Sequence, residues 1–263
     1  MGQHLLINRG EKMKREHWKK GDDNILTRAK DLLLQGKKTI VSPTKVGYVI
    51  ITVDYPGLER KFMLKNRPKT KPSVVLCTSA EHVEQLADIN EDIKKLYRSC
   101  EKKNVLLGCI LPWKSEAVDQ YIPKDGTREL VMDKRNTSCF VICFGEPSEK
   151  ICKKLWIKHQ LLVFASSANP SGKGNRGQIE GVGEQILTGV DMAIEADDYV
   201  AKQLPHSTTE TRYEQGVMVS MVDAQGKLVD IPIVIRKGLM IDQIMLELSS
   251  IWDKFDYRHG LYY

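Results

Sequence analysis

The sequence lacks long apolar runs and also lacks the short motifs of several common enzyme classes. No segment approaches the roughly 20 apolar residues that a membrane helix needs, and the basic start of the chain contains no apolar core of a secretion signal. There is no G-x-x-x-x-G-K-[ST] loop, no G-x-S-x-G turn and no H-E-x-x-H pair. We therefore expect a cytoplasmic protein without a membrane partner, which uses neither a P-loop nor the machinery of those hydrolases.

The cysteines give no sign of a metal site. None forms a C-x-x-C motif, and none stands beside a histidine at the spacing of a zinc site. Most lie in apolar stretches, where a free thiol packs as a small hydrophobic group. We expect free, mostly buried thiols at Cys77, Cys100, Cys109, Cys139, Cys143 and Cys152.

The composition is that of an ordinary folded protein. The 263 residues are 41% hydrophobic and 28% charged, and a chain of this length can bury a sizeable core. The net charge of +6 permits an anionic partner, either a nucleotide or RNA, without requiring one. Because no repeat or Gly/Ser linker interrupts the chain, we expect one central domain over residues 21–240, with an N-terminal extension (1–20) and a C-terminal helix and tail (241–263).

Apolar periodicity predicts alternating helices and strands without a regular β-α-β rhythm, which favours an α/β fold with a mixed sheet between helices. The predicted helices cover residues 24–36, 57–64, 80–88, 91–101, a segment starting at Pro147, 178–187 and 241–252. The predicted strands cover two segments within 38–53, then 73–78, 105–111, 128–132, 138–144, 161–166, 191–195, 216–223 and 231–236, with a further strand near Leu5–Ile7. Residues 197–215 are polar and irregular, which suggests an insertion or a lid.

The segment KNRPKTKP contains two cations with a restrained backbone. Lys65 and Arg67 are two residues apart, and Pro68 disfavours the helical region for Arg67. On an extended backbone the two side chains would point to the same side, where they would suit a phosphate or a small carboxylate. The alternative is a basic surface loop.

The segment SSANPSG follows a strongly apolar predicted strand. Ser167 and Asn169 are again two residues apart, and Pro170 keeps Asn169 extended. Ligands of open α/β sheets bind beyond the carboxyl ends of strands, and hydroxyl and amide groups there can bind phosphate or ribose oxygens. The alternative is a plain turn, because these residue types are common in turns.

Two further segments place polar residues beside apolar strands. Thr44 lies between two strands and could hold a substrate group, while Tyr48 begins an apolar strand; the alternative is a strand break with a core tyrosine. Ser220 and Arg236 interrupt apolar strands, where a polar group needs a partner. Arg236 could pair with a phosphate or with an acidic side chain.

The order and spacing of these four segments resemble the YrdC-like family over about residues 20–240. Its characterised members are nucleotidyltransferases that convert ATP, bicarbonate and L-threonine into threonylcarbamoyl-AMP and pyrophosphate, for threonylcarbamoyladenosine formation in tRNA. The resemblance implies a single-domain YrdC-like fold, in which a twisted mixed β-sheet flanked by helices carries a basic concave cleft.

The resemblance also implies roles for individual residues. It places catalysis on Lys65 and Arg67, and amino-acid binding on Thr44 and Tyr48. It assigns ATP binding to Lys65, Arg67, Ser167, Asn169, Ser220 and Arg236. Mg²⁺ would accompany ATP without a metal site of the protein's own, and tRNA is a further candidate partner.

Several departures from the family pattern cluster on the amino-acid side. Lys45 stands where an acidic residue usually follows P-T, Leu76 where a histidine is often found, and Ile142 where the family has an arginine. The Gly47–Tyr48 pair resembles the YciO branch, which typically loses the K-x-R and S-x-N motifs that this chain keeps. The amine substrate therefore stays open between L-threonine and another amine. The alternatives are a non-catalytic paralogue that binds nucleotide or RNA, and an enzyme that uses carbamoyl phosphate.

Overall fold

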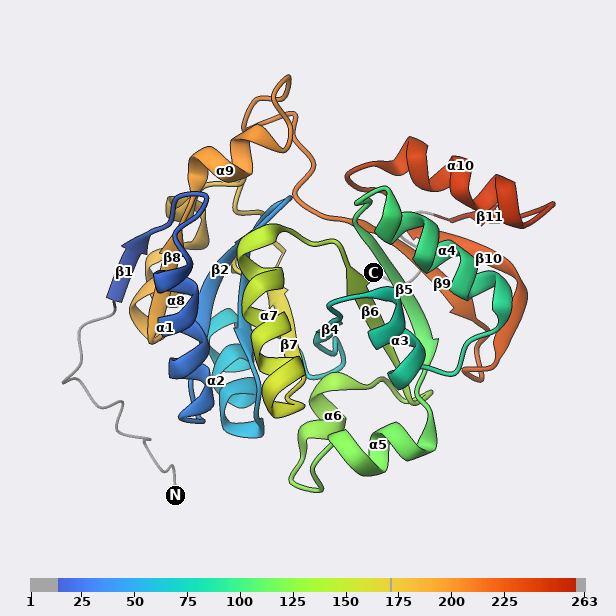
Figure 1. The fold of residues 1–263 in the computed structure, drawn as a ribbon, viewed down its shortest axis with the longest axis horizontal. Helices are drawn as coiled ribbons and strands as arrows, with labels where there is room; N and C mark the ends of the chain where they lie inside the picture. The colour runs from blue at the N-terminus through green and yellow to red at the C-terminus, as the bar shows by residue number, and fades with distance from the viewer. Residues whose placement is uncertain (1–13, 171, 259–263) are drawn as a thin grey trace.

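An eleven-stranded mixed sheet runs through the computed structural model, which describes residues 14–170 and 172–258 (Figure 1). The strand order is β1-β8-β2-β3-β7-β4-β6-β5-β9-β10-β11. The strands are β1 (Lys14–His17), β2 (Ile40–Thr44), β3 (Gly47–Thr52), β4 (Val74–Leu76), β5 (Leu107–Pro112), β6 (Thr137–Ile142), β7 (Val163–Ser167), β8 (Met192–Glu195), β9 (Val217–Val222), β10 (Leu228–Arg236) and β11 (Asp256–Tyr257).

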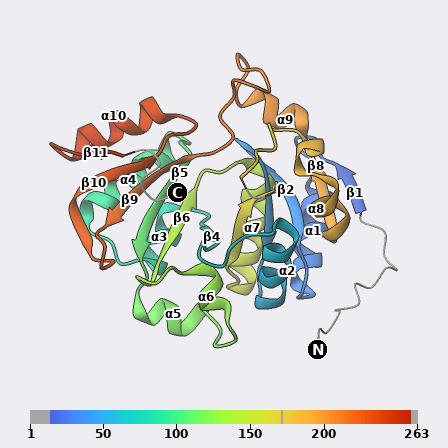
Figure 2. The same ribbon diagram turned by 180° about the vertical axis from the view of Figure 1, so that it is seen from behind.

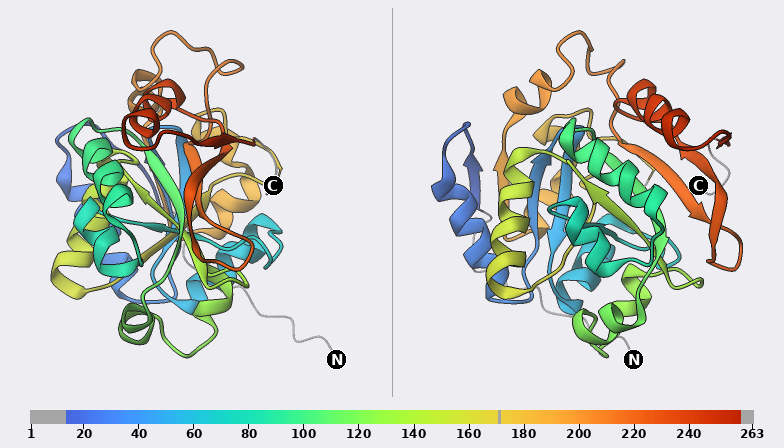
Figure 3. Two further views of the ribbon diagram at one scale, coloured as in Figure 1. Left: turned by 90° about the vertical axis from the view of Figure 1, so that its right-hand side faces the viewer. Right: turned by 45° about the vertical axis from the view of Figure 1, so that its right-hand side comes forward.

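The sheet mixes parallel and antiparallel pairs, as the sequence predicted. In its middle, β7 runs antiparallel to both of its neighbours, β3 and β4. β4 is parallel to β6, and β5 is parallel to β9. Figure 3 shows how strongly the sheet twists from one end to the other.

Helices cover the sheet on both sides. They are α1 (Asp23–Leu34), α2 (Tyr55–Lys65), α3 (Ala80–Leu86), α4 (Glu91–Lys102), α5 (Ser115–Tyr121), α6 (Thr127–Val131), α7 (Glu146–His159), α8 (Glu184–Gly189), α9 (Asp197–Lys202) and α10 (Ile241–Ile251). α1 and α7 pack on each other and share a hydrophobic cluster with β2 and β7. α2 lies behind these strands in Figure 1 and in front of them in Figure 2. Its Leu64 packs with α8 against β3.

Most predicted elements are confirmed, and the exceptions are short. The predicted strand at 128–132 is wrong: the segment forms α6, where the Asp125 carboxylate accepts the Thr127 N–H (3.0 Å) and starts a helical turn. α5 was not predicted. The predicted helix at 178–187 is a 3₁₀ turn (Ile179–Val182) followed by α8.

Two stretches also contain elements that the sequence did not predict. Residues 14–17 belong to the predicted N-terminal extension, yet they form β1 and pair with β8. The predicted strand near Leu5–Ile7 lies outside the described residues. Within the segment 197–215, residues 197–202 form α9 and the rest rises above the sheet as an irregular loop (Figure 1).

In the part of the chain that the structure describes, no helix is both long enough and apolar enough to cross a bilayer. All six cysteines are free thiols, and five of them are buried. The same described residues contain no group of three or more His, Cys, Asp or Glu side chains that could hold a metal ion. The expectation of free, mostly buried thiols is confirmed, with Cys143 partly exposed.

Candidate functional site at the end of strand β7

The structure brings Lys65 and Ser167 into direct contact, although 102 residues separate them in the chain. The Lys65 ammonium donates one hydrogen bond to the main-chain carbonyl of Ser167 and another to its hydroxyl (3.2 Å). Lys65 is the last residue of α2, and Ser167 is the last residue of β7. The K-x-R and S-x-N segments therefore meet at one end of the central strands.

The local backbone around Lys65 differs from the prediction of an extended pair. α2 starts after Asp54, which accepts the Gly57 N–H (2.9 Å), and it runs through Lys65. Asn66 takes the left-handed conformation (φ 48°), which ends the helix with the pattern of a C-terminal cap. Pro68 restricts the backbone of Arg67 only. The Lys65 side chain therefore projects from the end of a helix and the Arg67 side chain from the loop that follows, and the two do not share one side of a strand.

The environment of Lys65 disfavours its positive charge. Its side chain is buried (2% exposed), and this burial, with a smaller contribution from Arg67, lowers its pKa to about 7. In the described part of the chain, no carboxylate lies within ion-pair distance of its ammonium group. An anionic ligand would supply the missing opposite charge.

A second buried lysine on α2 was missed by the sequence analysis. Lys61 lies one helical turn before Lys65, is fully buried, and donates a hydrogen bond to the Ser73 hydroxyl (2.6 Å). Burial is the main reason why its pKa lies well below the usual value, followed by the charges of Arg67 and Lys65. The predicted helix ended at residue 64, before Lys65, so the i, i+4 relation of the two lysines became visible only in the structure.

Arg67 is anchored to the loop that follows it. Its guanidinium donates to the main-chain carbonyls of Lys71 (2.8 Å) and Pro72 (3.1 Å), and its Cζ lies 5.9 Å from the centre of the Phe62 ring. These bonds fold the loop 67–72 around the guanidinium. They hold the second cation of the K-x-R motif close to the end of α2.

Asn175 fixes the loop that contains Asn169, and sequence reasoning missed it as well. Its side-chain amide donates to the carbonyls of Tyr48 (3.0 Å) and Ala168 (3.3 Å), and its Oδ1 accepts the Gly177 N–H (3.1 Å). Asn169 itself is buried and donates to the Pro170 carbonyl (2.8 Å). The loop after β7 is thus tied to β3 by one asparagine.

This arrangement explains Gly47. Its backbone has φ +135°, and a Cβ atom there would lie 2.2 Å from Asn175 Oδ1. Only glycine meets both conditions without strain or collision. Gly47 is therefore required by the way Asn175 packs against β3.

We expect an Asn175→Ala substitution to lower the free energy of unfolding by about 1–3 kcal/mol, because the buried Gly177 N–H and the Ala168 carbonyl lose their side-chain partner. The Tyr48 carbonyl loses one of its two donors and keeps the Ala168 N–H (2.7 Å). Urea denaturation would measure this loss. The control is Gln185→Ala on α8, an exposed position where the change should stay within about 0.5 kcal/mol. Equal effects of the two substitutions would contradict the role of Asn175.

Thr44 and Tyr48, predicted to bind the amino acid, use their hydroxyls within the fold. The Thr44 hydroxyl donates to the Gly47 carbonyl (2.8 Å) across the β2–β3 turn. The buried Tyr48 hydroxyl donates to the Asp197 carboxylate and accepts the Ala196 N–H (2.9 Å). Burial, reinforced by Asp197, raises the pKa of Tyr48 well above its usual value. Their role toward an amino acid stays a prediction.

The departures from the family pattern lie in two different settings. Lys45 is buried, and its ammonium donates to the main-chain and side-chain oxygens of Asn104 (both 2.7 Å). Burial lowers the pKa of Lys45. Leu76 and Ile142 are core residues of β4 and β6. Lys45 thus ties the β2–β3 turn to the end of α4, and the other two fill the core.

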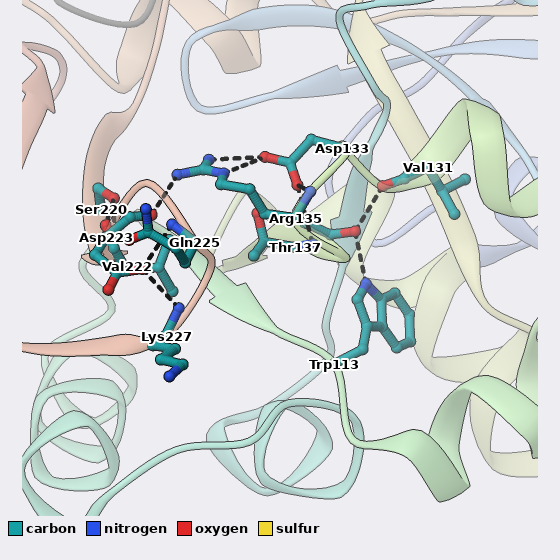
Figure 4. Close-up of polar contacts among 11 residues, drawn as sticks. Trp113, Val131, Asp133, Arg135, Thr137, Ser220, Val222, Asp223, Gln225 and Lys227 are labelled. Atoms are coloured by element: carbon teal, nitrogen blue, oxygen red, sulfur yellow. Dashed lines mark hydrogen bonds and ion pairs between the residues drawn. The ribbon is translucent and has the colours of Figure 1, made fainter.

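Ser220 lies on β9 and Arg236 on β10. In the strand order, β4, β6 and β5 separate these two strands from β7, which carries Ser167. The Ser220 hydroxyl donates to the Val222 carbonyl (3.1 Å), and Arg236 Nε donates to the Gly216 carbonyl (2.9 Å). Figure 4 shows Ser220 beside the β9–β10 turn. The structure therefore places these two residues in a separate part of the sheet from Lys65 and Ser167, and their predicted ATP contacts stay untested.

The Asp223 carboxylate organises the β9–β10 turn. It accepts the N–H groups of Gln225 (2.8 Å) and Lys227 (2.9 Å), and the Lys227 bond is the main reason why its pKa is lowered. The Asp223 carbonyl accepts a hydrogen bond from Arg135 (3.1 Å), whose guanidinium also pairs with Asp133 (Figure 4). In this structure Asp223 acts on the backbone of the turn.

Comparison with known proteins gives the chain a family. The Sua5/YciO/YrdC family model, described as telomere recombination, matches residues 32–217. No curated protein matches the chain significantly.

Solved structures share the fold. A hypothetical protein (smu.1377c) from Streptococcus mutans UA159 is 48% identical, with a TM-score of 0.90 over 96% of this chain and 100% of its own. P. abyssi Sua5 complexed with L-threonine is 19% identical, with a TM-score of 0.65 over 91% of this chain and 62% of its own, so the present chain spans about three-fifths of Sua5. E. coli YciO is 16% identical, with a TM-score of 0.62 over 87% of this chain and 96% of its own. The chain belongs to the Sua5/YciO/YrdC family.

Proposed function

We propose that the protein is an ATP-dependent synthase of the L-threonylcarbamoyladenylate type, which joins ATP, bicarbonate and L-threonine or another amine and releases pyrophosphate. The observation that carries this proposal is the contact of the buried Lys65 ammonium with Ser167 at the end of β7. A buried cation that has no carboxylate partner among the described residues, and that lies beside a hydroxyl and a strand end, suits a phosphate-bearing ligand.

The proposed reaction has two bond-forming steps. The amine nitrogen attacks the bicarbonate carbon, and water leaves, which gives a carbamate. A carbamate oxygen then attacks the α-phosphorus of ATP, and the bond between that phosphorus and the oxygen bridging to the β-phosphate breaks. The products are the carbamoyl-AMP anhydride and pyrophosphate, and no covalent enzyme intermediate is needed.

In this reaction the side chains act by positioning and by neutralising charge. Lys65 and Arg67 would hold bicarbonate and the ATP phosphates, while the Ser167 hydroxyl and the Asn169 amide would hold the nucleotide. Because the pKa of Lys65 is about 7 without ligand, binding of an anion would favour its charged form.

Mg²⁺ would neutralise part of the phosphate charge. Since the described residues contain no group of three metal-ligating side chains, the ligands of Mg²⁺ would be the ATP phosphates and water. None of the actions proposed for the protein's own side chains depends on a metal site of its own.

The amine is the most open part of the proposal. The Sua5 structure complexed with L-threonine supports an amino-acid substrate within the shared fold. In this chain, however, Lys45 donates both of its observed hydrogen bonds to Asn104, and Ile142 fills the core where the family has an arginine. The product would serve tRNA modification in the cytoplasm if the amine is L-threonine.

The proposal predicts pyrophosphate release that depends on both bicarbonate and an amine. The full chain is incubated with Mg²⁺-ATP, bicarbonate and a panel of amino acids, and pyrophosphate and the adenylate are measured. Reactions without bicarbonate serve as the control for simple ATP hydrolysis. ATP binding without amine-dependent pyrophosphate release would contradict the synthase and support a non-catalytic nucleotide-binding protein.

A further inference from the structure

The roles proposed so far do not explain why Lys61, a charged residue, is completely buried. We propose that Lys61 is a third anion-binding side chain of this site, which together with Lys65 holds the pyrophosphate portion of a nucleotide. This inference rests on the proposed function, because it extends the same phosphate-binding site. It assigns a role to a residue outside the K-x-R and S-x-N motifs.

The first support is the burial of Lys61 without an opposite charge. Its side chain has no solvent exposure, and the described residues place no carboxylate within ion-pair distance of its ammonium. Its observed hydrogen bond goes to a neutral hydroxyl, that of Ser73 (2.6 Å). Burying an ammonium in this way destabilises a fold unless another group compensates for it. A methionine would fill the same space without that penalty, so packing alone does not account for a lysine.

The second support is position. Lys61 and Lys65 are one turn apart on α2. Ser73, the partner of Lys61, directly precedes Val74, which pairs with Ala165 on β7, two residues before Ser167. The hydroxyl partners of the two lysines therefore lie at the same end of two adjacent strands.

Arg67 completes the cluster of cations. Lys61 Nζ lies 5.8 Å from the centre of the Phe62 ring, and Arg67 Cζ lies 5.9 Å from the same centre. The charges of Arg67 and Lys65 both lower the pKa of Lys61, in addition to the larger effect of burial. Three cationic side chains thus share one small region, and such a region gains most from a ligand with several negative charges.

The third support is an unpartnered hydroxyl. Ser166 is 5% exposed, and its hydroxyl has no hydrogen-bond partner among the described residues. Ile50, which pairs with Ser166, packs with Leu64 of α2, so Ser166 faces the side of the sheet that α2 covers. Buried polar groups are normally satisfied, and a phosphate oxygen would be a suitable acceptor for this hydroxyl.

The test separates anion binding from a structural tie between α2 and β4. Binding of inorganic pyrophosphate and of ATP to the full chain is measured by calorimetry for the wild type, Lys61→Met and Ser73→Ala, with thermal unfolding of each. Lys158→Met, which removes the same charge from an exposed site on α7, is the matched control. We expect Lys61→Met to weaken pyrophosphate binding at least tenfold while the midpoint of unfolding stays equal or rises. Ser73→Ala and Lys158→Met should bind within about twofold of the wild type.

The opposite pattern would overturn the inference. If Lys61→Met and Ser73→Ala both lower the unfolding midpoint and leave anion affinity unchanged, Lys61 is a structural tie. If Lys61→Met does not fold, Lys61→Arg, which keeps the charge, is measured in its place. The inference then requires that Lys61→Arg still binds pyrophosphate. If Lys61→Met binds pyrophosphate as well as the wild type does, the inference about Lys61 is wrong and the proposed synthase is unaffected. If the wild type shows no synthase activity but its pyrophosphate binding depends on Lys61, the proposed function is wrong and the inference stands. A wild type that binds neither anion would overturn both.

Discussion

A Lys65→Met substitution is expected to lower the kcat/KM for amine-dependent pyrophosphate release by about 100-fold or more. The ammonium group contacts Ser167 at the proposed phosphate position, and removing one donor from a preorganised charge-binding site has effects of about this size. The methionine keeps the volume of the side chain and removes its charge. The measurement is initial-rate kinetics of pyrophosphate release, together with ATP affinity.

The fold should survive this substitution, because it removes a buried charge rather than a packed apolar group. Thermal unfolding checks that point, and Lys158→Met on the exposed side of α7 controls for the change in net charge. A Lys65→Met protein that folds normally and keeps activity within threefold of the wild type would show that Lys65 does not hold the reacting phosphates.

The stability of the protein is expected to fall steeply in acid because of His82. This residue of α3 is buried, its Nδ1 accepts the Thr78 N–H (3.2 Å), and its ring stacks on Trp156 with centroids 3.9 Å apart. Burial lowers the pKa of His82 from 6.5 to about 3. The unfolded chain therefore takes up this proton first as the pH falls. The stability due to neutral His82 is complete above about pH 6.5 and is lost progressively toward pH 3.

The size of this loss can be measured against a variant that does not titrate. Between pH 7.5 and pH 4, linkage predicts a contribution of about 3 kcal/mol to the free energy of unfolding. Between these two pH values, the free energy of unfolding of His82→Phe, measured with denaturant, should fall by about this much less than that of the wild type. Phenylalanine does not titrate, and it can still stack on Trp156. His206→Gln, at an exposed site, should follow the wild type. Parallel curves for His82→Phe and the wild type would contradict the assignment.

The sequence predicted the parts of the site that depend on local backbone chemistry. An apolar strand followed by S-x-N identified β7 and the loop after it, because strand ends and proline restrictions are local properties. The prediction for Lys65 failed for an equally local reason. The helix α2 continues through Lys65 and ends at the left-handed Asn66, whereas the proline rule, which restricts only Arg67, had been extended to the whole segment.

Other parts of the site depend on contacts between distant segments and could not be predicted locally. Asn175 gains its importance only because β3 lies beside the loop after β7. Lys61 looks like an exposed helix residue in a segment with several charges until β4 brings Ser73 against it. The predicted strand at 128–132 failed because its apolar residues reach the core from a single helical turn.

The order of strands in the sheet sets a lower limit on the smallest segment that can fold. The family match ends at residue 217, the first residue of β9, although β9 pairs with β5 and also with β10. A fragment cut at that boundary would leave the outer backbone amides and carbonyls of β5 without partners, on a strand whose side chains belong to the main core. We therefore expect the autonomous folding unit to include β9, and a fragment that ends at residue 217 to aggregate on expression.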